Sequence, residues 1–125
     1  MKATGTVEVK SWDEKTWDGR PHAEVEGRKL TEAQVSFAYT GDVTGVSSCR
    51  YLMYYGDDVA WTTALEEIVA DGGTVVLRHV GAYRTSVEAV IEIVDGTGVF
   101  AGAKGAATVD WAEDGRGTYT LEYEV

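Results

Sequence analysis

Short stretches in which apolar and polar residues alternate cover most of this chain. Side chains along a β-strand point to opposite faces in turn, so such alternation predicts strands with one buried face. Turn residues such as Gly41-Asp42 and Glu113-Asp114-Gly115 separate the stretches. Regularly spaced short strands indicate a sandwich or a barrel, and closing the barrel leaves no unpaired strand edge. We therefore predict an all-β fold, a single eight-stranded antiparallel β-barrel over residues 1–125. The expected strands are Ala3–Asp13, Leu30–Thr40, Gly45–Tyr55, Val59–Ala70, Thr74–Tyr83, Ser86–Val94, Gly105–Trp111 and Thr118–Val125.

The stretch from Asp58 to Gly72 also fits an amphipathic helix. Asp58 suits the N-cap, and Gly72 suits the position after the last helical residue. Intrinsic propensity slightly favours this helix, whereas the strand Val59–Ala70 depends on pairing with its neighbours. The helix would carry one apolar stripe formed by Trp61, Leu65, Ile68 and Val69.

The strand interpretation makes Val59–Ala70 and Thr74–Tyr83 the two arms of a hairpin. Gly72-Gly73 would then form a two-residue turn of the primed type, which needs positive φ. This register places Glu66 opposite His79, so a carboxylate meets an imidazole inside the barrel. The complete inward face of the hairpin would be Glu66, Ile68, Ala70, Val75, Leu77 and His79, followed by Ala64 opposite Gly81 and Thr62 opposite Tyr83.

The preceding strand joins the same inward face if Gly56 pairs with Val59 across a tight turn. Two registers are possible, and we prefer the one that keeps Arg50 in water. It directs Cys49, Tyr51 and Met53 inward, and Val35, Phe37 and Tyr39 then extend the lining. A one-residue slip would instead direct Arg50, Leu52 and Tyr54 inward.

Composition narrows the function classes. The chain has 125 residues with a net charge of −10, which argues against a nucleic-acid surface and against an anionic membrane face. No apolar run approaches the ~20 residues of a membrane helix. The one cysteine, Cys49, excludes an internal disulfide. We expect a cytoplasmic protein with no nucleic-acid or membrane partner.

The longest irregular segment is Glu14–Lys29, which contains Trp17, Pro21 and His22 among charged residues. Long loops in small domains are often lids, and an exposed tryptophan favours a lid because it needs a surface to cover. The alternative is a surface loop with no role in binding. His22 is expected to be a solvated side chain.

Five segments resemble one protein family, in order and over nearly the whole chain. The most specific are Trp12-Asp13-Glu14 and Gly96-Thr97-Gly98. The chain is identified on these residues as a member of domain-of-unknown-function family 3224. The resemblance implies a calycin-like, eight-stranded barrel similar to allene oxide cyclase and the dirigent proteins. Those relatives bind apolar small molecules, guide a cyclisation or coupling, and form oligomers. The resembling segments are Ala3–Glu14, Tyr51–Tyr55, Leu65–Ile68, Val76–Gly81 and Gly96–Gly105.

The resemblance also favours a strand over Val59–Ala70. The chain departs from the family at Leu65-Glu66-Glu67, where Leu-Glu-Arg is common, and in the shorter hairpin Val69–Thr74. Both departures lie beside the expected pocket, which weakens any inference from the family to the ligand.

Glu66 and His79 are the candidate catalytic residues. A carboxyl group in a barrel interior beside an imidazole can take or give a proton near neutral pH. The alternative is a structural pair that satisfies itself and sets the strand register. Cys49 is most simply a buried core residue. The candidate substrate-binding residues are Tyr51, Met53, Phe37, Tyr39, Thr62, Ala64, Leu77, Tyr83 and Trp12.

No cofactor or metal is expected. The chain has no phosphate-binding loop, and its two histidines, His22 and His79, lie on different elements, so a metal site would need carboxylates as well.

Three functions fit these observations. The first is a cofactor-independent cyclase, isomerase or related proton-transfer lyase of secondary metabolism, acting on an apolar oxygenated metabolite. The second is a non-catalytic, lipocalin-like carrier of such a ligand, and the third is a structural oligomer with a packed interior. We expect a homodimer, because apolar residues face outward at Leu52, Tyr54, Leu65 and Val80.

Overall fold

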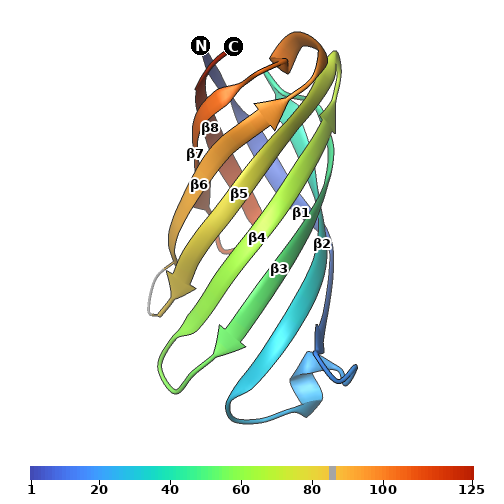
Figure 1. Ribbon diagram of the computed structural model, residues 1–125, viewed down its shortest axis with the longest axis vertical. Coiled ribbons are helices and arrows are strands. Elements are labelled where there is room, and N and C mark those ends of the chain that lie inside the picture. The colour runs from blue at the N-terminus through green and yellow to red at the C-terminus, as the bar shows by residue number, and fades with distance from the viewer. Residues whose placement is uncertain (85–86) are drawn as a thin grey trace.

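The computed structural model describes residues 1–84 and 87–125, and eight strands in these ranges form one closed antiparallel barrel (Figure 1). Each strand pairs with its neighbours in chain order, and β1 closes the barrel by pairing with β8. No helix among these residues is long and apolar enough to cross a membrane. The elements are β1 (Lys2–Thr16), η1 (His22–Glu24), β2 (Lys29–Gly41), β3 (Gly45–Tyr55), β4 (Ala60–Ala70), β5 (Gly73–Tyr83), β6 (Val87–Gly96), η2 (Gly98–Phe100), β7 (Lys104–Trp111) and β8 (Arg116–Glu124).

The predicted barrel is therefore confirmed, and the helix considered for Asp58–Gly72 is wrong. Val59 precedes strand β4, whose side chains alternate between buried and exposed along its length. Pairing with β3 and β5 on either side outweighs the slight helical propensity of this stretch. Ser86, the expected first residue of the sixth strand, lies outside the described residues.

Strand β1 is longer than expected, because it continues to Thr16 instead of ending at Asp13. The strand contains a bulge between Val9 and Ser11. One extra residue in a strand reverses which side chains face inward beyond it. Trp12, Glu14 and Thr16 consequently share the inner face with their partners on β2, which are Val35, Ala33 and Thr31.

The β4–β5 hairpin has a register two residues away from the predicted one. Ala70 pairs with Gly73, so the turn is Asp71-Gly72, and only Gly72 in this turn has a positive φ, of 88°. Gly73 is needed for a different reason, since a Cβ there would lie 2.0 Å from the Thr97 carbonyl oxygen. The prediction of a primed Gly72-Gly73 turn is therefore wrong.

This shift changes partners but not faces. Glu66 now pairs with Leu77, and His79 pairs with Ala64. Because the shift is an even number of residues, both side chains still point into the barrel. They meet diagonally across the strand pair.

The β3–β4 register agrees with the preferred prediction. Gly56 N–H donates to the Val59 carbonyl across the turn, and Cys49 pairs with Glu66. Cys49, Tyr51 and Met53 are buried, whereas Arg50 and Leu52 are exposed. Leu65 and Val80 are also exposed on the outer surface.

One end of the barrel is filled by its own side chains. This end carries the chain termini and η2 (Figure 1). The Tyr119 hydroxyl donates to the carbonyl of Val43 and accepts from its N–H, which holds the β2–β3 turn. The packing here includes Ala3, Val7, Val43, Ile68, Val75, Ile93, Phe100, Ala103, Tyr119 and Leu121. The buried side chains at this end form part of the hydrophobic core.

Candidate functional site

A buried carboxyl group lies inside the barrel, where the packed half ends. Glu66 on β4 is 1% exposed. Its Oε1 lies 2.8 Å from His79 Nε2, and its Oε2 accepts a hydrogen bond of 2.6 Å from the Tyr39 hydroxyl. Both carboxyl oxygens thus have partners, as a polar group in a dry interior requires.

Side chains from four adjacent strands meet in this cluster. Tyr39 comes from β2 and reaches Glu66 across the intervening strand β3, while His79 comes from β5. Cys49 on β3 is directly paired with Glu66 and is 2% exposed, so its predicted burial is confirmed. The barrel wall holds these side chains on rigid, hydrogen-bonded backbone, which favours a fixed geometry.

A cavity of about 500 Å³ opens beside the cluster. Its volume lies in the range of small-molecule sites. Glu66, His79 and Tyr39 form one part of its wall, and the opposite wall comes from β6 and β7, including Ala89 and Thr108. The remaining lining residues are Phe37, Tyr51, Tyr83, Ile91, Ala107, Val109, Asp110 and Trp111.

A second cavity of about 380 Å³ continues toward the end that carries η1. The two cavities share Phe37, Tyr51, Tyr83 and Trp111 in their walls. Trp12 stacks on Tyr51 with ring centroids 5.5 Å apart and remains 47% exposed. The space leading to Glu66 is therefore enclosed mainly by aromatic rings.

Most of the predicted substrate-binding residues border this space. Phe37, Tyr39, Tyr51 and Tyr83 line the cavity beside Glu66. Trp12 and Met53 line the second cavity. The other three predicted residues, Thr62, Ala64 and Leu77, are buried on the inner face but outside the lining of these two cavities.

The tyrosine hydroxyls around Glu66 are kept protonated. Burial raises the pKa of Tyr39 well above its usual value, and the charge of Glu66 raises it further. Burial also raises the pKa of Tyr51 and of Tyr83, with Cys49 adding to both shifts. The hydroxyls of Tyr51 and Tyr83 consequently offer hydrogen-bond donors to a ligand oxygen at neutral pH, whereas that of Tyr39 donates to Glu66.

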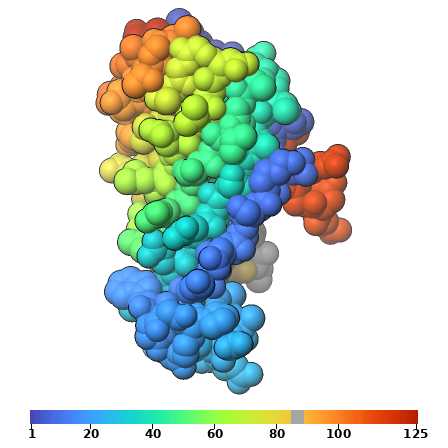
Figure 2. Space-filling model, turned by 90° about the vertical axis from the view of Figure 1, so that its right-hand side faces the viewer, coloured from blue at the N-terminus to red at the C-terminus, as the bar shows by residue number. Residues whose placement is uncertain are grey.

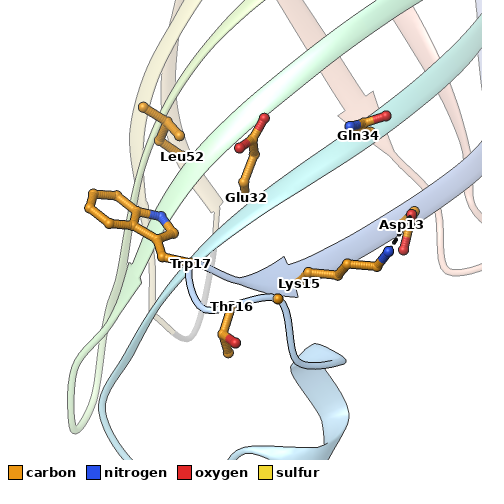
Figure 3. A pocket seen from close by; sticks show the side chains of 8 residues that line it. Asp13, Lys15, Thr16, Trp17, Glu32, Gln34 and Leu52 are labelled. Carbon is orange, nitrogen blue, oxygen red and sulfur yellow. Dashed lines mark ion pairs between the residues drawn. The ribbon is translucent and has the colours of Figure 1, made fainter.

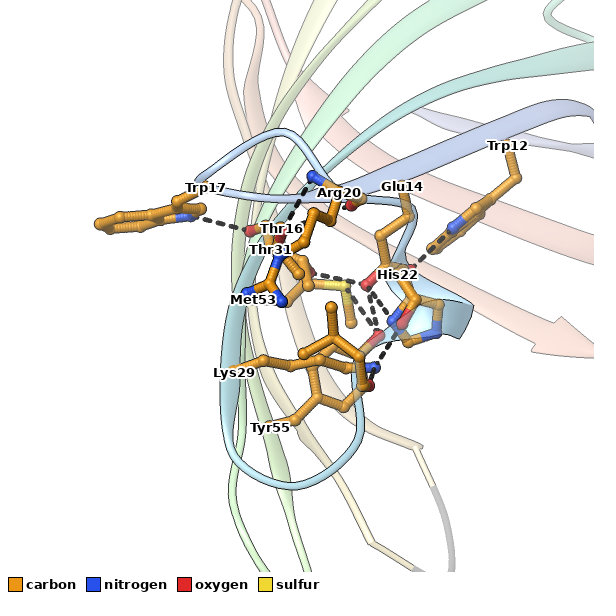
Figure 4. A network of polar contacts seen from close by, with 11 residues as sticks. Trp12, Glu14, Thr16, Trp17, Arg20, His22, Lys29, Thr31, Met53 and Tyr55 are labelled. Atoms are coloured by element: carbon orange, nitrogen blue, oxygen red, sulfur yellow. Dashed lines mark hydrogen bonds and ion pairs between the residues drawn. The ribbon is translucent and has the colours of Figure 1, made fainter.

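A second polar cluster, absent from the sequence-based prediction, lies at the end of the barrel that carries η1 (Figure 4). The side chain of Glu14 on β1 is 5% exposed. Its Oε2 accepts hydrogen bonds from Thr31 Oγ1 at 2.6 Å and from the Tyr55 hydroxyl at 2.5 Å. Its Oε1 accepts from Trp12 Nε1 at 3.0 Å. His22 completes the cluster, with Nδ1 3.5 Å from the carboxyl group.

His22, predicted as a solvated side chain, is only partly solvated, with its side chain 34% exposed. Its ring stacks on Tyr55 with centroids 5.1 Å apart, and its Nδ1 is buried. Lys29 Nζ donates to the carbonyls of His22 and Val25 at 2.8 Å each, which ties η1 to the barrel. An inward Glu14 was not predicted because the bulge in β1, which reverses the alternation, has no clear sequence signal.

The comparisons with known proteins assign the family. A model of the family described as "Protein of unknown function (DUF3224)" matches residues 3–123. The chain belongs to this DUF3224 family. The resemblance to the DUF3224 family inferred from the sequence is thereby confirmed. The search of curated proteins found no match.

Two solved structures are similar to this DUF3224 chain. One is a DUF3224 protein of unknown function from Shewanella oneidensis MR-1, with a TM-score of 0.79 and 21% identity, covering 99% of this chain and 96% of that chain. The other is named pyocyanin demethylase, with a TM-score of 0.71 and 19% identity, covering 99% of this chain and 100% of that chain. At these identities the likeness shows the fold.

Trp17 in this DUF3224 chain lies on the outside of the barrel. Its indole N–H donates to the Thr31 carbonyl at 3.2 Å, and the residue remains 63% exposed. It borders a groove of about 430 Å³ with Glu32, Gln34 and Leu52 (Figure 3). Figure 2 shows the segment that follows β1, in blue, gathered at the end of the molecule away from the termini. Trp17 therefore does not cover the cavity beside Glu66, and the argument for a lid that rested on it is wrong.

Proposed function

We propose that this DUF3224 protein binds an apolar, oxygenated small molecule inside the barrel and catalyses a proton transfer on it. The reaction class is a cyclisation, an isomerisation or a related lyase step that needs no cofactor. The observation that carries the proposal is the buried Glu66, which contacts His79 and Tyr39 and borders a cavity of about 500 Å³.

The proposed mechanism assigns one role to each group. Glu66 takes or gives the proton, and His79 at 2.8 Å is its proton-exchange partner. Tyr51 donates a hydrogen bond to the oxygen of the ligand, where negative charge develops as the proton leaves. The aromatic walls hold the ligand in a reactive shape and exclude water.

Two findings support an enzyme. A buried ionisable group at the wall of a cavity is a candidate for proton transfer, and Glu66 is buried and borders the cavity. One structural neighbour is named pyocyanin demethylase, which is an enzyme name, although the two chains share 19% identity.

The test uses Glu66→Gln, which keeps the size of the side chain and removes the acid. Pyocyanin is the first compound to assay, followed by apolar ketones and phenols in D₂O, with turnover and deuterium incorporation followed by mass spectrometry. We expect turnover to fall at least about 100-fold in Glu66→Gln, in line with the usual contribution of a general acid or base. Full activity in this variant would remove Glu66 from the mechanism.

A matched pair of variants tests whether the reaction takes place in the cavity. Ala107→Phe fills the cavity, because Ala107 lines it, whereas Ala106→Phe places the same ring on the exposed face of β7. The first variant should lose ligand binding and turnover, and the second should keep both. Equal effects of the two variants would contradict the proposed binding site.

The second candidate is a lipocalin-like binding protein. It is favoured by the internal hydrogen bonds of Glu66, since both carboxyl oxygens already have protein partners. In that case Glu66→Gln would bind the ligand as the wild type does, and neither protein would convert it.

A further inference from the structure

Three different ligand-type side chains lie close together, and two of them, Glu66 and His79, line the cavity. The Sγ of Cys49, a carboxyl oxygen of Glu66 and a ring nitrogen of His79 all lie within 4.8 Å of one another. They come from inward-facing positions on three adjacent strands, β3, β4 and β5, so the pairing of these strands brings them together. Within residues 1–84 and 87–125, this is the one such group of three or more.

The chemistry of the three groups is that of a zinc site. Thiolate sulfur, imidazole nitrogen and carboxylate oxygen are the side-chain ligands that Zn²⁺ binds in proteins, usually with tetrahedral geometry. A thiolate disfavours Mg²⁺ and Ca²⁺, which prefer oxygen ligands. We propose that Cys49, Glu66 and His79 bind Zn²⁺, with the fourth position open toward the cavity.

The distances are compatible with this site. Ligand atoms around a tetrahedral Zn²⁺ are roughly 3.5 Å apart, given bonds of about 2.0–2.3 Å. The widest separation here is at most 4.8 Å, while His79 Nε2 and Glu66 Oε1 are 2.8 Å apart. Shifts on the order of 1 Å, within reach of side-chain rotations, would equalise these separations.

The electrostatics of the barrel interior also favour a divalent cation. One thiolate and one carboxylate carry two negative charges, which a Zn²⁺ ion balances, so the loaded centre has no net charge to desolvate. Tyr39 donates to Oε2 of Glu66, the oxygen that does not face His79, and would hold the carboxylate in place as a ligand.

Binding exchanges one set of bonds for another. The Zn–S, Zn–N and Zn–O bonds form as the ion gives up water ligands, and the hydrogen bond between His79 and Glu66 breaks. The coordinating nitrogen of His79 must be free of a proton, so any proton on it moves through solvent to the other ring nitrogen, and the thiol proton of Cys49 leaves to solvent. The apparent affinity should therefore increase with pH, by up to about tenfold per pH unit.

This inference goes beyond the proposed function and does not depend on it. Zinc would occupy the same side chains that are proposed to transfer the proton. The loaded and the metal-free protein are then alternative states of one centre, and we expect zinc to block proton transfer.

The test is a titration of the full chain with Co²⁺, a spectroscopic substitute for Zn²⁺, followed by displacement with Zn²⁺. We expect a sulfur-to-cobalt charge-transfer band in the near ultraviolet, which zinc removes. X-ray absorption on the zinc-loaded wild type should find one sulfur ligand together with nitrogen and oxygen ligands. The absence of sulfur coordination in the wild type would overturn the proposal without the use of any variant.

Two variants on the same strand make the test specific. Cys49→Ser removes the soft ligand and should abolish the charge-transfer band and weaken zinc binding at least tenfold. Ser47→Ala, at the previous inner position of β3, should change neither. Unchanged affinity in a folded Cys49→Ser variant would contradict the zinc site. Because these readouts need no substrate, they fail or succeed independently of the activity of Glu66→Gln.

Discussion

The barrel contains two clusters that each combine a glutamate, a histidine and a tyrosine. The two clusters differ in their surroundings. Tyr39, Glu66 and His79 border a cavity of about 500 Å³. In the other cluster, Glu14 accepts hydrogen bonds from the side chains of three residues and has His22 3.5 Å away. The first cluster borders an internal cavity, whereas the second lies at the barrel end that carries η1 and is filled by the protein's own donors.

This difference helps to distinguish buried carboxyl groups that stabilise the fold from those that can act on a ligand. A carboxylate whose acceptors are filled by protein donors stabilises the fold, because those donors lose their partner if it is removed. Glu66 also has both carboxyl oxygens occupied, by His79 and Tyr39, so the cavity that it borders is what distinguishes it from Glu14. On this basis we propose a structural role for Glu14 and a functional one for Glu66.

The largest effect is expected from replacing each glutamate by methionine, which has a similar volume. Glu14→Met leaves the donors of Trp12, Thr31 and Tyr55 without their acceptor, at about 1 kcal/mol each, so the free energy of unfolding should fall by about 3 kcal/mol. Glu66→Met should lower it by about 2 kcal/mol, because it leaves two buried donors, those of Tyr39 and His79, without their acceptor.

Urea unfolding measures both values. The wild type and the two variants need the same urea dependence of the unfolding free energy for the comparison to hold. If Glu66→Met proved more destabilising than Glu14→Met, the assignment of roles would be reversed.

An intermediate effect is expected from acid. Burial opposes ionisation of Glu14, but the hydrogen bonds from Thr31, Tyr55 and Trp12 outweigh it and lower its pKa from the ordinary value of 4.5. The folded state then binds fewer protons than the unfolded state near this pH. The contribution of Glu14 to the free energy of unfolding should therefore be fully present above about pH 5. It should be lost as the pH falls through the lowered pKa of Glu14.

Glu14→Gln is the control for the acid effect. Unfolding free energies measured from pH 7 to pH 3 should decrease less steeply in this variant than in the wild type, since one carboxyl group has been removed. Parallel curves for the two proteins would show that Glu14 contributes nothing to the acid sensitivity.

The smallest effect is expected from His22→Ala. The His22 side chain is 34% exposed, and its loss removes a ring that stacks on Tyr55. Global stability should fall by only about 0.5–1 kcal/mol. Amide hydrogen exchange over residues 17–28 should become faster, while exchange in β4 and β5 should stay unchanged. Protection of residues 17–28 that matched the wild type would show that His22 does not hold this segment.

The candidate site was predictable from the sequence to a limited depth. Alternation along the β4–β5 hairpin placed Glu66 and His79 on one inner face, and an even error in register left that result intact. Tyr39 was expected to line the cavity as a substrate-binding residue, and its contact with Glu66 was not expected. That contact joins β2 to β4 across the intervening strand β3. Such a contact depends on the curvature and closure of the barrel and not on any local pattern.

The cluster around Glu14 could not be predicted from the sequence for a different reason. Lys10 is the extra residue of the bulge in β1, and the paired backbone of β2, with Phe37 opposite Val9 and Val35 opposite Trp12, is what defines it. Extending the alternation of β1 without a bulge would place Glu14 on the outer face.

The order of polar and apolar residues by itself determined the all-β class and most of the strands and, once Val59–Ala70 is taken as a strand, the inward direction of Glu66 and His79. Strand parity is a local property of the backbone, so neighbouring residues are enough to specify it. Only the tertiary structure decided the hairpin register, the inward turn of Glu14 and the place of the cavity. These depend on the bulge, on the packing of Thr97 against Gly73 and on barrel closure, which join residues far apart in the chain.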